Sequence, residues 1–83
     1  MKIGEAYVIK YEDCDEFMAE FLEDYDRDES IVSKGFIRVK FIPKNNDDKP
    51  LVILGEIKMR LEWGNELILH RSKIKRIESV APY

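Results

Sequence analysis

The stretch from residue 12 to residue 29 constrains the fold most, because it joins a helical apolar period to a dense run of acids. Apolar side chains recur at steps of three and four residues, at Cys14, Phe17, Met18, Phe21, Leu22 and Tyr25. That spacing places them on one face of an α-helix. We therefore predict an amphipathic helix over residues 13–25, with Glu12 or Asp13 as its N-cap.

The segments around this helix alternate with a period of two, which is typical of β-strands. One expected strand covers residues 5–11, and another covers residues 37–42. Residues 51–63 predict one long strand with a bulge or bend at Gly55. Because Trp63 falls in the apolar register of that strand, we expect its side chain in the core.

The C-terminal third continues the strand pattern less clearly. A turn at Gly64–Asn65 leads into an expected strand over residues 66–70. Apolar residues spaced by three follow, and they leave open a short helical turn and a last strand within residues 71–80. Together the elements favour an α+β fold of one domain, residues 1–83: one helix packed on a curved antiparallel sheet of about five strands, which can curl into a half-open barrel.

Acids and bases are segregated along the chain. Residues 12–29 carry ten carboxylates and one cation, so their net charge is about −9, whereas the remainder carries about +6 and the whole chain −3. Such segregation has two interpretations. The acidic segment can pair with basic strands of the same molecule, or it can present a charged surface to a ligand or partner.

The sharpest indication of a ligand is the triplet Asp24, Asp26 and Asp28, spaced at i, i+2 and i+4 directly after the expected helix. Ca²⁺ takes six to eight oxygen ligands, and alternating acids in a loop can converge on one ion. We therefore predict a weak Ca²⁺ site with these three ligands, and with Glu23 or Glu29 completing the shell. Whether Asp47 and Asp48 join this site is left open.

This triplet resembles the first half of an EF-hand loop, and Ile31 stands where that family has an apolar residue. Two positions depart from the family pattern. Glu29 replaces the glycine of the sharp turn, and Gly35 replaces the bidentate glutamate. The resemblance therefore covers about eight residues and implies cation binding, without the family's fold or sensor role.

The whole chain is similar to small α+β proteins of methanogenic archaea, at least one of which is described as calcium-binding with an acidic patch. The similarity lies in the length, the acidic segment and the strand-rich remainder. It implies Ca²⁺ as a ligand and indicates no cellular role.

Two other functions compete with the cation site. On the expected helix, Glu12, Glu16 and Glu20 would form one exposed ridge, which predicts a module that docks a basic protein partner. The third hypothesis is a nucleic-acid-binding small barrel that uses basic residues near the C-terminus, namely Arg71, Lys73, Lys75 and Arg76. The acidic composition and the lack of an aromatic residue between these cations weigh against it.

No catalytic motif is visible, so we expect no enzymatic activity. His70 is the single histidine, and Cys14 has only acids beside it, the opposite of what activates a thiol nucleophile. The chain has no phosphate-binding loop and no zinc-ligand spacing. With one cysteine and no long apolar run, we expect a monomeric cytoplasmic protein with no membrane segment.

Overall fold

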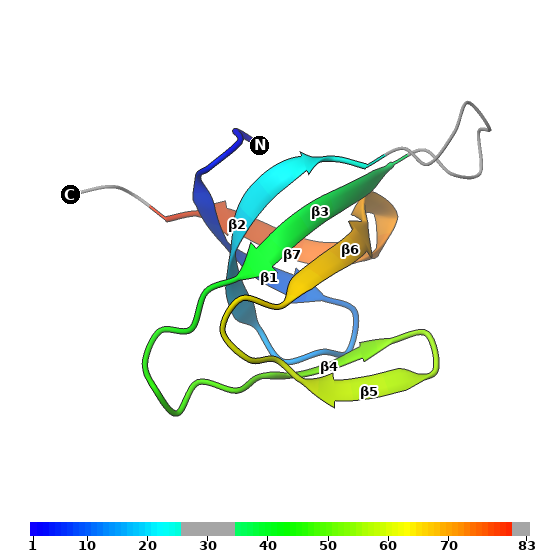
Figure 1. The fold of residues 1–83 in the computed structure, drawn as a ribbon. Helices are drawn as coiled ribbons and strands as arrows, with labels where there is room; N and C mark the ends of the chain where they lie inside the picture. The colour runs from blue at the N-terminus through cyan, green and yellow to red at the C-terminus, as the bar shows by residue number, and fades with distance from the viewer. Residues whose placement is uncertain (26–34, 81–83) are drawn as a thin grey trace.

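The computed structural model describes residues 1–25 and 35–80, and across these ranges the chain consists of β-strands with no α-helix (Figure 1). The only helical turn in this part is the short 3₁₀ segment η2 (Arg71–Lys73). The strands are β1 (Ala6–Tyr11), β2 (Phe17–Asp24), β3 (Phe36–Phe41), β4 (Leu51–Leu54), β5 (Ile57–Arg60), β6 (Glu66–His70) and β7 (Ile74–Ser79). No helix in these residues is long and apolar enough to cross a membrane.

Five strands form one antiparallel sheet in the order β6-β3-β2-β1-β7, and β4 pairs with β5 in a separate hairpin. In a flat sheet, the edge strands β6 and β7 would lie about 19 Å apart, four steps of about 4.8 Å. Yet η2 joins them with three residues, which rise only about 6 Å in a 3₁₀ helix. The sheet must therefore curl, as Figure 1 shows, and its concave face encloses the core.

The core consists of the inward-facing residues of the curled sheet, closed by residues of the hairpin and the loops. Ala19 is fully buried on β2, the central strand, which pairs with β1 on one side and β3 on the other. The buried apolar side chains are Tyr7, Ile9, Tyr11, Cys14, Phe17, Ala19, Phe21, Ile37, Val39, Phe41, Val52, Leu61, Leu67 and Leu69. The β4–β5 hairpin contributes Val52 directly and covers one end of this core.

The predicted amphipathic helix over residues 13–25 is wrong, and with it the α+β fold class. Most of that segment is strand β2, whose alternate residues Phe17, Ala19 and Phe21 are buried. This segment fits both a strand pattern and a helix pattern, because its apolar residues alternate and also recur at steps of three and four. Pairing with β1 and β3 stabilises the strand, because it satisfies the hydrogen-bonding groups of the backbone and places Glu20 opposite Lys40.

The long strand predicted for residues 51–63 is also corrected. The chain reverses at Gly55 and Glu56, so Leu54 pairs with Ile57 and two short strands replace one. Gly55 has a φ of +65°, which suits the first position of a tight hairpin turn, and the pairing of Leu54 with Ile57 excludes a bulge in a continuous strand. Residues 71–80 combine both open alternatives, the helical turn η2 followed by strand β7.

Candidate functional site

Within the described residues, four of the five acids that were expected to bind a cation or a partner are paired with cations of this same chain. Each pair joins the acidic segment to a residue of β3, η2 or β7. The pairs are Glu12 with Lys73 (3.6 Å), Glu23 with Arg38 (3.4 Å), Asp24 with Arg71 and Glu16 with Arg76. This confirms the interpretation that the segregated charges pair within the molecule.

The three acids of the predicted docking ridge lie in different parts of the fold. Glu12 lies in the turn after β1, Glu16 precedes β2, and Glu20 faces Lys40 across the β2–β3 pair. Without a helix these three acids do not form one ridge. Because the pairs are partly exposed, each contributes only about 0.2–1 kcal/mol to stability. Each pair also means that one acid of the surface already has a partner.

The basic residues that were candidates for nucleic-acid binding share this pairing. Arg71, Lys73 and Arg76 each contact an acid of the N-terminal segment. Among these four candidates, only Lys75 has no acidic partner in the described residues. A phosphate backbone would have to displace the carboxylates, which weakens this hypothesis.

The predicted calcium ligands are only partly described. Glu23 and Asp24 lie at the end of β2 with their arginine partners, whereas Asp26, Asp28 and Glu29 lie outside the described residues. Within residues 1–25 and 35–80, no three or more His, Cys, Asp or Glu side chains are grouped to hold a metal ion. The Ca²⁺ site therefore stays a prediction.

The acids of the loop after β3 do not lie near Asp24. Asp24 pairs with Ile37 at the start of β3, whereas Asp47 and Asp48 follow the other end of that strand. The length of β3 separates the two groups of acids. The question that the sequence left open is thus answered for Asp24: Asp47 and Asp48 do not join it.

Trp63 departs most from its expected position. Its side chain was expected in the core, but the residue is 67% exposed. It occupies a closed turn: the Glu62 N–H donates to Asn65 Oδ1 (2.8 Å), and the Asn65 N–H donates to the Glu62 carbonyl (3.0 Å). Gly64, with a φ of +86°, completes the turn. The indole therefore projects to the surface from a hydrogen-bonded turn.

The loop after β3 forms the wall opposite this turn. Asp48 Oδ2 accepts a hydrogen bond from the Lys44 N–H (2.9 Å), and Asn45 Oδ1 accepts one from the Asp47 N–H (2.9 Å). The Asp48 N–H in turn donates to the Asn45 carbonyl (3.2 Å). This loop, like the turn, is fixed by its own hydrogen bonds.

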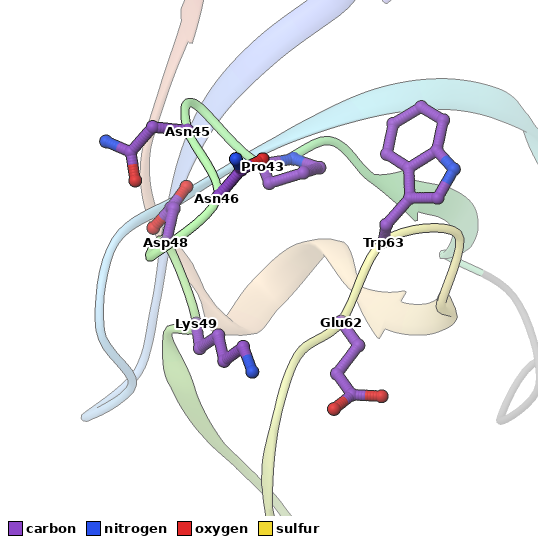
Figure 2. Close-up of a pocket in the computed structure, with 7 residues that line it drawn as sticks. All are labelled: Pro43, Asn45, Asn46, Asp48, Lys49, Glu62 and Trp63. Atoms are coloured by element: carbon purple, nitrogen blue, oxygen red, sulfur yellow. The ribbon is translucent and has the colours of Figure 1, made fainter.

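Between the turn and the loop lies a hollow of about 210 Å³, which we call the Trp63 groove. Figure 2 shows Pro43 and Trp63 toward one end of it, with Lys49 and Glu62 on opposite walls toward the other. Lys40 Nζ lies 5.6 Å from the indole centroid, within cation–π range. The groove is lined by Pro43, Asn45, Asn46, Asp48, Lys49, Glu62 and Trp63.

The groove is small and of mixed polarity. Sites for drug-sized ligands usually span about 300–1,000 Å³, so this hollow suits a single side chain better than a cofactor. No protein-family model, curated protein or solved structure matches this chain. The resemblance to calcium-binding archaeal proteins thus stays a prediction.

Sequence reasoning missed the groove because Trp63 sits in an apolar register. A signal for its exposure was present next to it, since Gly64–Asn65 was recognised as a turn. A large aromatic residue in a tight turn projects from the surface unless another segment covers it. The distant loop that forms the opposite wall had no comparable signal.

Proposed function

We propose that this protein is a polypeptide-binding module whose Trp63 groove receives a side chain of an extended partner segment. The observation that carries the proposal is the exposed indole on a hydrogen-bonded turn, beside a hollow whose opposite wall is a second hydrogen-bonded loop. Tryptophan is among the residues that most often dominate binding energy in protein interfaces. A rigid support lowers the entropy that binding costs.

The lining indicates the chemistry of the ligand. Pro43 and Trp63 offer apolar contacts, and Asn45 and Asn46 offer amide groups that can bond to a peptide backbone. Asp48 and Glu62 offset the charges of Lys49 and Lys40, so the groove presents no net positive charge to the phosphates of a nucleic acid. A peptide with an aliphatic or proline side chain therefore fits better than a single-stranded nucleic acid.

The module keeps the interaction role that the sequence suggested, but moves it from the acidic segment to the Trp63 groove. We also propose a cytoplasmic location, in keeping with the free thiol of Cys14.

The test uses Trp63 as its own probe, because it is the only tryptophan in the chain. A display library of random short peptides would be selected on the whole protein, and the enriched peptides titrated while indole fluorescence is followed. We expect enriched peptides to share an apolar or proline residue and to shift the emission. Trp63→Ala removes the fluorescent probe, so its binding would be measured by calorimetry, and we expect it to be weaker at least tenfold, about 1.4 kcal/mol.

Ile68 provides a matched control, since it is a large apolar residue that is 44% exposed on β6 and does not line the groove. Ile68→Ala should leave peptide binding unchanged. If the library enriches nothing that depends on Trp63, the proposal fails. Saturable binding of single-stranded RNA that weakens steeply with salt would instead favour the nucleic-acid hypothesis.

A further inference from the structure

The two outer edges of the β4–β5 hairpin differ. The edge of β4 is closed by the loop before β2: the Asp15 N–H donates to the Leu51 carbonyl (2.9 Å), and the Leu51 N–H donates to Asp15 Oδ2 (2.9 Å). The Ile53 N–H donates to Cys14 Sγ (3.1 Å). This edge has no room for another strand.

The edge of β5 is open. Leu54 and Ile57 flank the two-residue turn, and the Leu61 N–H donates to the Pro50 carbonyl (2.9 Å), so the backbone groups of Ile57, Met59 and Leu61 point toward β4. The backbone groups of Lys58 and Arg60 therefore point outward. Within the described residues, neither has a hydrogen-bond partner for its N–H or carbonyl.

The side chains of β5 alternate between two kinds of surface. Lys58 and Arg60 lie on one face and are exposed. Ile57 (65% exposed) and Met59 lie on the other face, where Met59 packs against the core. Arg60 contacts Asp15 at 3.9 Å, whereas Lys58 has no acidic partner in the described residues. The edge thus carries cations on one face and exposed apolar surface on the other.

A second copy of this chain does not complement this edge. If two β5 strands paired with each other, lysines and arginines would face each other across the pair, and like charges directly opposite are destabilising. Charged edge residues commonly suppress such self-association. The same cations would attract a strand that places acids opposite them.

We propose that the edge of β5 binds an extended acidic segment of a protein partner as an added antiparallel strand. The segment alternates acidic residues, which lie beside Lys58 and Arg60, with apolar residues, which cover Ile57 and Met59. Main-chain hydrogen bonds to Lys58 and Arg60 provide affinity, and the alternation provides specificity. This surface adjoins the Trp63 groove, since Arg60 Nη1 donates to the Lys49 carbonyl (3.1 Å), but it shares no lining residue with the groove, so either proposal can fail without the other.

The test is a titration of the ¹⁵N-labelled whole protein with a blocked peptide of alternating Glu and Val. We expect the amide signals of Lys58 and Arg60 to shift and their hydrogen exchange to slow. Lys58→Glu should weaken binding at least tenfold, whereas the control Lys44→Glu, which changes an exposed lysine of the loop after β3, should not. A peptide of alternating Lys and Val should not bind.

Strand addition has a sharper signature in the peptide backbone. Two versions of the peptide are N-methylated at alternate residues. In the first, the methyl groups replace the backbone N–H donors that would face β5, and in the second they replace those that would face solvent. We expect the first peptide to lose binding and the second to keep it. Equal binding of both methylated peptides would overturn the proposal. So would binding of the Lys peptide, no binding of the Glu peptide, or loss of binding in Trp63→Ala.

Discussion

Cys14 joins two parts of the chain that are distant in sequence. It is 1% exposed, and its Sγ accepts the Ile53 N–H at 3.1 Å and lies 3.5 Å from the Ile53 carbonyl. We predict that Cys14→Ala lowers the free energy of unfolding by about 1–3 kcal/mol, because it leaves these partly buried backbone groups without a partner. Urea denaturation would measure the change.

The neighbouring Asp13 is exposed and provides the control, so Asp13→Ala should change stability by less than about 0.5 kcal/mol. Cys14→Ser, which keeps a donor and an acceptor, should cost less than Cys14→Ala. An alanine variant as stable as the natural protein would mean that the thiol does not hold the hairpin to the sheet.

The β4–β5 hairpin depends on Gly55 at the first position of its turn, where φ is +65°. A Cβ there would meet no atom within 4 Å, so the cost of a side chain is conformational and not steric crowding. We predict that Gly55→Ala destabilises the protein by about 1–2 kcal/mol. Hydrogen exchange of the Leu54 and Ile57 amides should quicken more than exchange in the five-stranded sheet.

Glu56, the other residue of this turn, is exposed and has no positive φ. Glu56→Ala should therefore leave both stability and exchange nearly unchanged. If Gly55→Ala were equally silent, the chain would adopt a turn at residues 55–56 that does not require glycine.

For the whole molecule, internal charge pairing restricts where a cation can bind. Asp24 already contacts Arg71, so the calcium hypothesis now depends on Asp26 and Asp28. With a dissociation constant on the order of 10⁻⁴–10⁻³ M, Ca²⁺ at ten times that concentration should stabilise the protein by about 1.4 kcal/mol. We predict that Asp26→Asn with Asp28→Asn removes this gain in melting temperature, whereas Asp24→Asn keeps most of it.

The measurement needs fixed ionic strength, because general screening also changes the energy of the exposed ion pairs. Mg²⁺ is the control ion, since it demands near-ideal octahedral geometry and loses its waters reluctantly, so we expect the carboxylates to bind it more weakly than Ca²⁺. Equal responses of all three proteins to Ca²⁺ would remove the aspartates from the site.

The sequence by itself determined the strands whose alternation is unambiguous. The strands expected over residues 5–11, 37–42 and 66–70 are confirmed by β1, β3 and β6, each within one residue of the expected bounds. It also determined that the segregated acids and bases can neutralise each other. Both are local or compositional properties, which a chain carries before it folds.

Tertiary structure decided the rest. Residues 17–24 satisfy a helical and a strand period at once, and only pairing with β1 and β3 selects the strand. Trp63 has an apolar register but becomes exposed, because the chain reverses at Gly55 and no segment within residues 1–25 and 35–80 covers the turn that follows β5. The Trp63 groove and the open edge of β5 arise from such non-local contacts, which no short window of sequence encodes.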